Sequence, residues 1–203
     1  MSIGRSAPFV LARRLILVVA AALTPATSLT AVEAPRTSVT VRVYQTADLP
    51  LALEQRVLAE ADAVLRGALI DVRWRKCAER ISAAACVDPP ESSELLLRIA
   101  LEGIPRKDRP RTLGLAIVSR CTGGQLASVY VDRVTTLADE AATDVAVLLG
   151  RVAAHELAHL MMGTSVHHAR RGLMRPNWTL AEVRRNRAAD WVFTTEDVAA
   201  IRR

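Results

Sequence analysis

Hydrophobic and polar residues follow two different periods along the chain, which predict a mixture of strands and helices. From Ser38 to Tyr44 three valines recur at every second position, so they lie on one face of a strand. From Leu51 to Leu65 apolar residues recur at helical spacing, and Gly67 is placed to end this helix. Four further apolar runs predict strands: 70–74, 94–101, 113–119 and 126–131. The pattern therefore predicts an α/β (α+β) fold.

A longer apolar stretch, from about Glu140 to Met162, predicts a helix that carries the candidate chemistry. It contains His155, Glu156 and His159. Because helical residues four apart lie on one face, the two imidazoles can bind a single Zn²⁺ ion while the glutamate stands beside the metal's open position. This arrangement suits hydrolysis by zinc-activated water, with Glu156 as the catalytic general base. Gly163 is positioned to end the helix in a left-handed cap.

The order of these parts resembles the metzincin superfamily of zinc endopeptidases, and more closely a group of small secreted bacterial metzincin-like (matrixin-like) proteins. Its members place a helix with the HExxH motif after a mixed sheet, end that helix at a glycine, and return a third histidine before a methionine turn. Gly163 matches the glycine and Met174, in Gly172-Leu173-Met174, matches the methionine turn. The resemblance implies that Met174 forms a hydrophobic floor under the histidines.

The resemblance also implies a third zinc ligand, and His167 is the expected one. The usual motif has the glycine three residues after the second histidine and the third histidine six after it. Here Gly163 follows His159 by four residues and His167 follows it by eight. His168 is the alternative ligand, because the longer return could bring either neighbour to the metal.

By the same resemblance we expect a mixed, twisted five-stranded sheet with a backing helix and an active-site helix. Residues 35–163 would form this N-terminal subdomain, and residues 164–203 a small, mostly helical C-terminal subdomain. The substrate would be an extended peptide or unfolded protein, paired with the edge strand at 113–119. The alternative function is a zinc-containing domain that binds peptide without cutting it, or that has a structural role in the envelope. We expect a monomer.

The first 34 residues have the order of a secretory signal peptide, with arginines before the apolar run 15–23 and small residues after it. Cleavage after Ala31 or after Ala34 would satisfy the small-residue requirement, and retention as an N-terminal anchor is the alternative. The apolar run is too short to span a bilayer, so we expect no stable membrane span after signal removal. The sequence therefore predicts a secreted, periplasmic or otherwise extracytoplasmic bacterial protein.

The charge of the chain adds little to this picture. Removing residues 1–34 takes away three arginines and one glutamate, which lowers the formal net charge from +6 to +4. Basic runs at 106–111 and 184–187 are typical of a solvated loop and a solvated helix face. Aromatic residues make up only 3% of the chain and do not interleave with these runs, so we expect no nucleic-acid partner.

Three cysteines occur in a chain that is expected to enter an oxidising compartment. Cys77 and Cys86 bracket a short segment, and a disulfide between them would fix a loop. A pairing of Cys86 with Cys121 is the alternative. None of the three lies at CxxC spacing, so we do not expect them to bind zinc.

Overall fold

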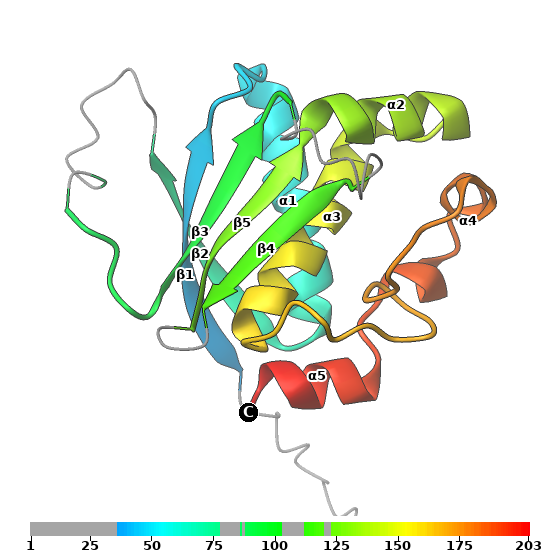
Figure 1. Ribbon diagram of the computed structural model, residues 1–203. Helices are drawn as coiled ribbons and strands as arrows, with labels where there is room; N and C mark the ends of the chain where they lie inside the picture. Colours follow the sequence, from blue (N-terminus) through cyan, green and yellow to red (C-terminus); the bar gives the residue numbers. More distant parts are fainter. Residues whose placement is uncertain (1–35, 78–85, 87, 103–111, 120–122) are drawn as a thin grey trace, which may run out of the picture. The chain divides into compact units, whose positions relative to one another are not determined.

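The computed structural model describes residues 36–77, 86, 88–102, 112–119 and 123–203 (Figure 1). The described residues belong to one compact unit. The expected signal segment, the basic run 106–111 and Cys121 lie outside them, and the boundary expected between residues 163 and 164 stays a prediction. Within the described residues, no helix is both long enough and apolar enough to cross a membrane.

The five strands form one mixed sheet in the order β2-β1-β3-β5-β4 (Figure 1). Their bounds are β1 Thr37–Gln45, β2 Ile70–Cys77, β3 Glu94–Ala100, β4 Gly114–Ser119 and β5 Gly123–Tyr130. β1 pairs in parallel with β2 and β3, and β3 pairs in parallel with β5. β4 runs antiparallel to β5 at the edge of the sheet. The expected mixed five-stranded sheet is therefore confirmed.

Two long helices, α1 (Leu51–Gly67) and α3 (Val145–Met161), pack on the same face of the sheet (Figure 1). α3 is buried along almost its whole length, from Ala146 to Leu160. Gly150 lets the two helices approach closely, because a Cβ atom there would lie 2.7 Å from the carbonyl oxygen of Val57. α3 thus packs against both α1 and the sheet, and its C-terminal turns carry the HExxH residues.

The expectation of one helix from about Glu140 to Met162 is wrong at its N-terminal end. α2 (Val131–Ala141) follows β5 directly and ends at Ala142, which has the left-handed φ of 52°. α3 begins only after Asp144, whose side chain accepts a hydrogen bond of 2.8 Å from the N–H of Ala146. An aspartate in this position stabilises a helix start because it satisfies a backbone N–H that has no partner within the helix.

The regular elements of the C-terminal segment, residues 164–203, are short helices joined by irregular stretches. These helices are α4 (Leu180–Arg185), the 3₁₀ helix η2 (Ala188–Trp191) and α5 (Thr195–Ile201). α4 and α5 each begin with a capping box, formed by Thr179 with Glu182 and by Thr194 with Asp197. These reciprocal hydrogen bonds let such short helices start at a defined residue.

The predicted disulfide between Cys77 and Cys86 is present, with the two Cα atoms 5.6 Å apart at the end of β2. A buried ion pair joins Arg42 of β1 to Glu94 of β3, with nitrogen and oxygen 2.6 Å apart. Arg42 also donates a hydrogen bond of 2.7 Å to the carbonyl oxygen of Asp88. The disulfide and the hydrogen bond from Arg42 therefore hold Cys86 and Asp88 beside the sheet.

Candidate metal centre and catalytic site

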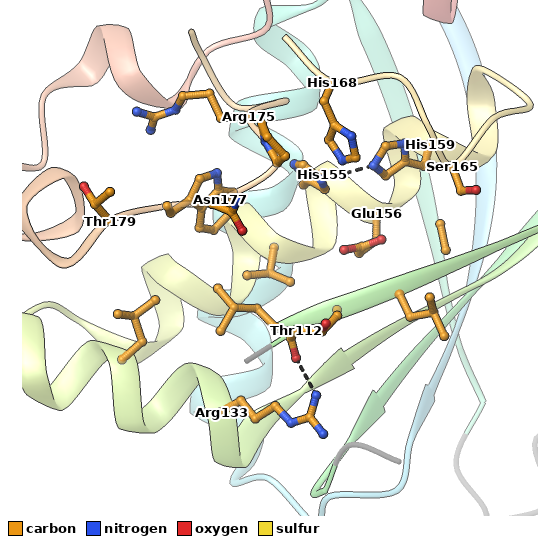
Figure 2. Close-up of a pocket in the computed structure, with 18 of the residues that line it drawn as sticks. Thr112, Arg133, His155, Glu156, His159, Ser165, His168, Arg175, Asn177 and Thr179 are labelled. Carbon is orange, nitrogen blue, oxygen red and sulfur yellow. Dashed lines mark hydrogen bonds between the residues drawn. The ribbon is translucent and has the colours of Figure 1, made fainter. Parts of the chain in front are cut away.

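His155, Glu156 and His159 lie on the last turns of α3 and are buried, with 8%, 8% and 3% of their surfaces exposed. The two imidazole rings are 4.8 Å apart between centroids and nearly perpendicular. Their Nε2 atoms face each other at 3.1 Å (Figure 2). The helical spacing in the sequence thus brings the two expected ligand atoms together.

The other nitrogen of each ring points to a backbone carbonyl group. Nδ1 of His155 lies 3.0 Å from the carbonyl oxygen of Leu173, and Nδ1 of His159 lies 3.0 Å from that of Thr164. A carbonyl oxygen only accepts hydrogen bonds, so both Nδ1 atoms carry the proton. In the neutral rings both Nε2 atoms then present lone pairs, which is the form that binds a metal.

The carbonyl group of Thr164 is aimed by the end of α3. Gly163 adopts a left-handed φ of 65°, as expected for the residue that ends the helix. The N–H groups of Gly163 and Thr164 donate to the carbonyl oxygens of Leu160 and His159, both at 3.1 Å. This pair of bonds is a Schellman motif. The same turn therefore closes the helix and orients the His159 ring.

His168, rather than the expected His167, joins the other two histidines. The ligating nitrogens of His155, His159 and His168 all lie within 4.8 Å of one another. The His168 ring stacks on His155 at a centroid distance of 5.8 Å and lies edge-on to His159 at 5.0 Å (Figure 2). His168 is exposed, so the cluster is open to solvent on that side.

His167 is turned away to the C-terminal helix. Its Nε2 donates a hydrogen bond of 2.7 Å to Oδ1 of Asp197, which is fully buried. The second carboxylate oxygen of Asp197 accepts the N–H of Thr194 at 2.8 Å in the capping box of α5. The choice of His167 as third ligand is corrected for this reason: its ring nitrogen is already bound to α5.

Burial keeps the two helical histidines uncharged. Desolvation is the largest cause that lowers the pKa of His155, to about 3, and of His159, to about 4. The neighbouring imidazoles lower both pKa values further, whereas the hydrogen bonds to the backbone raise them. Both rings are therefore neutral at pH 7, which is the protonation state that a metal ligand requires.

Glu156 lies between the histidines and the edge strand β4 (Figure 2). Burial raises the pKa of its carboxyl group to about 8, and the backbone hydrogen bond with Ala116 of β4 opposes that rise. The group thus holds or releases a proton near neutral pH. A pKa close to the working pH is what a general base needs.

Leu173 and Trp178 hold the first histidine in place. The carbonyl oxygen of Leu173 accepts both from His155 and from Nε1 of Trp178, the latter at 3.3 Å. The Trp178 ring also stands edge-on to His155, with centroids 5.8 Å apart. Met174, the expected methionine-turn residue, is fully buried. Its role as a floor under the histidines stays a prediction.

A cavity of about 1420 Å³ extends from the histidines along the start of β4. It is lined by residues 112–116, by part of α2 and by the segment 175–180 that follows Met174. Its lining also includes Ser165 and Val166, from the loop that follows α3. An extended chain laid through this cavity would pass both the imidazole cluster and Glu156.

The donor set fits a zinc ion. Two nitrogens bound to tetrahedral zinc at the usual distance are about 3.3 Å apart, and the Nε2 atoms of His155 and His159 are 3.1 Å apart. Two lone pairs that face each other at this distance repel, and a cation between them removes the repulsion. Three imidazole ligands would leave the fourth position of a tetrahedral zinc ion open, as in zinc sites that act on a substrate.

Several residues of the site escape sequence reasoning. Leu173, Thr164 and Ala116 contribute to the site through backbone groups. Every residue has backbone groups, so the choice of side chain at these positions does not reveal the contact. Asp197 does have a signal, because Thr194 directly precedes α5 and Asp197 is the third residue of that helix, as a capping box requires. That pattern indicates the start of a helix. It does not indicate that the other carboxylate oxygen of Asp197, Oδ1, accepts a hydrogen bond from His167.

Two imidazoles and a buried glutamate at the end of one helix, joined by a third imidazole from the loop that follows, define a candidate metal centre of the HExxH type beside a mixed sheet. No family model matches the sequence, and no curated protein matches it. Among solved structures, the chain is similar to archaemetzincin from Methanopyrus kandleri. The two share 17% sequence identity at a TM-score of 0.49, over 82% of this chain and 94% of that one.

Proposed function

We propose that the protein is a secreted or envelope zinc-dependent endopeptidase, with one zinc ion held by His155, His159 and His168. The observation that carries the proposal is the geometry of the two helical imidazoles. Their Nδ1 protons are fixed on backbone carbonyl groups, and their Nε2 lone pairs meet at 3.1 Å beside a buried glutamate.

Each residue then has a definite task. When bound, zinc supplies a Lewis acid that polarises a carbonyl group and lowers the pKa of a water molecule towards about 7. The Glu156 carboxylate accepts the proton of the attacking water and passes it to the leaving amine. Its raised pKa suits both transfers, because the protonated group is stable enough to form and acidic enough to give the proton up.

The edge strand β4 supports an extended peptide as substrate. The carbonyl oxygen of Leu113 accepts the N–H of Tyr130 and so points towards β5. Because backbone groups alternate along a strand, those of Gly114 and Ala116 point to the open edge, next to Glu156. A peptide that pairs with this edge is recognised mainly through its backbone, so unfolded proteins should be cleaved at many sequences.

The disulfide supports a location outside the cytoplasm. A bond between Cys77 and Cys86 persists in an oxidising compartment, which agrees with the signal-like order of residues 1–34. Fractionation of the producing cells tests this part of the proposal. The protein should be found outside the cytoplasm with the bond oxidised.

The activity is tested by incubating the purified protein with a reduced, alkylated protein substrate, with and without a metal chelator. Wild type should cleave the substrate, and the chelator should stop the cleavage. Glu156→Ala should still bind zinc but lose about 10²–10⁴-fold in turnover, because the proton acceptor is gone. Zinc binding without any cleavage by wild type would contradict the proposal and favour a non-catalytic peptide-binding domain.

A further inference from the structure

Strand β4 approaches Glu156 so closely that residue 114 has no room for a side chain. A Cβ atom at Gly114 would lie 2.7 Å from Cγ of Glu156 and 2.8 Å from its Oε1. Real Cβ atoms essentially never come within 3.0 Å of another heavy atom. The backbone of Gly114 does not have the positive φ found at Gly163 and Gly172. Space, and not backbone conformation, is therefore the reason for a glycine here.

Strand β4 contacts the Glu156 carboxylate at a second residue, Ala116. The backbone N–H of Ala116 hydrogen-bonds to Glu156, and this bond favours the charged form of the carboxylate. Gly114 and Ala116 stand two residues apart on the open edge of β4. They enclose the carboxylate from one side, while α3 holds it from the other.

We propose that Gly114 is a positioning residue for the general base. Without a side chain at this position, the Glu156 carboxylate can rest against the N–H of Ala116, beside the imidazole cluster. Any larger residue pushes the carboxylate away from that place. The proposal rests on the proposed function, because a base needs positioning only if the site turns over a substrate.

Gly114→Ala tests the proposal through the separate steps of catalysis. The three histidines are untouched, so zinc content should stay at the wild-type level. A displaced base slows the chemical step, so kcat should fall at least about tenfold, since a shift of 1 Å can cost about a hundredfold. KM for a peptide substrate should change less than about threefold, because the base does not bind the peptide and the substitution keeps the backbone groups of residue 114 that would pair with it.

A matched control separates this effect from a general loss of packing. Gly150→Ala introduces equally close contacts, 2.6 Å to Cβ of Glu60 and 2.7 Å to the carbonyl oxygen of Val57, on the side of α3 that faces α1. It should lower the melting temperature and leave the kcat of the folded enzyme within about threefold of wild type. An equal fall in kcat in both variants would overturn the role of Gly114.

A double-mutant cycle measured by melting temperature tests the contact between residue 114 and Glu156 without an activity assay. A Cβ at Gly114 would also lie 2.9 Å from the carbonyl oxygen of Ser128, so the substitution has a cost that is independent of Glu156. Glu156→Ala removes Cγ and the carboxylate, so Gly114→Ala should lower the melting temperature clearly less in that background. If Gly114→Ala does not fold, recovery of folding in the double variant supports the contact.

The outcomes distinguish the two levels of the proposal. A wild type that holds zinc and cleaves nothing contradicts the proposed function, and with it any base to position. An active wild type for which Gly114→Ala leaves kcat unchanged contradicts the role of Gly114 alone. Equal losses of melting temperature in both backgrounds, or no folding in either, also contradict it, because Ser128 then accounts for the whole cost.

Discussion

The direction of two ring protons determines what the imidazole cluster can bind. Because Nδ1 of His155 and Nδ1 of His159 donate to backbone carbonyl groups, their Nε2 atoms cannot donate to each other. The pair is therefore arranged for a cation that lies between the rings. The third ligand is whichever of the neighbours His167 and His168 faces these two rings, and in the structure this residue is His168.

The choice between His168 and His167 is tested by zinc affinity. His168→Ala removes a ligand, so it should weaken zinc binding by more than the ~10–100-fold that loss of a group supporting a ligand costs. His167→Ala removes only the bond to Asp197 and should keep most of the affinity. Competition with a chromophoric chelator measures both. A larger loss for His167→Ala would reverse the assignment.

At the scale of elements, the start of α3 depends on one side chain. Asp144 separates α3 from α2 by capping the new helix at Ala146, and its carboxylate also pairs with Arg56 on the surface. Asp144→Ala should lower the free energy of unfolding by about 1 kcal/mol, the usual contribution of such a cap. Urea unfolding measures the change.

Asp62→Ala is the matched control for this substitution. Asp62 forms an exposed ion pair with Arg66 within α1 and caps no helix. Its loss should cost a few tenths of a kcal/mol, since exposed ion pairs contribute little. If the two variants lose the same amount, the cap does not define the start of α3.

The junction of β1 and β3 gives the fold a dependence on acid. The hydrogen bond from Arg42 is the largest cause that lowers the pKa of Glu94, to about 2, and it outweighs desolvation. The folded state therefore prefers the charged carboxylate. Its contribution is complete above the unfolded pKa of about 4.5 and is lost as the pH falls from there towards 2.

Glu94→Gln tests this dependence, because the amide does not titrate. Thermal unfolding followed from pH 5 to pH 3 should show a shallower loss of stability in Glu94→Gln than in wild type, even if the variant is less stable throughout. Parallel declines in the two proteins would show that other groups cause the acid sensitivity.

For the whole molecule, the disulfide is a constraint on the unfolded chain. Cys77 and Cys86 are nine residues apart, and closing a loop of this size contributes about 2–3 kcal/mol in the chain-entropy description. Cys77→Ser with Cys86→Ser should lower the free energy of unfolding by about this amount and leave zinc content unchanged. An unchanged urea midpoint would contradict the expected contribution.

The sequence predicts the parts of this molecule that depend on local periodicity. Alternating valines in β1, the helical spacing of α1 and the HExxH spacing on α3 all depend on near neighbours. The pattern does not show the break at Asp144, because apolar residues continue on both sides of it. The return of His168 depends on the path of a loop and on Asp197, which is 30 residues away from His167 in the chain.

Titration of the zinc-free protein with zinc, while cleavage of a peptide is followed, tests the central claim most directly. Three histidines that hold one ion predict that activity rises in proportion to added zinc and stops rising at about one zinc per chain. Glu156→Ala should bind the same amount of zinc without gaining activity. Cleavage that does not depend on zinc, or no cleavage at any ratio, would contradict a zinc peptidase.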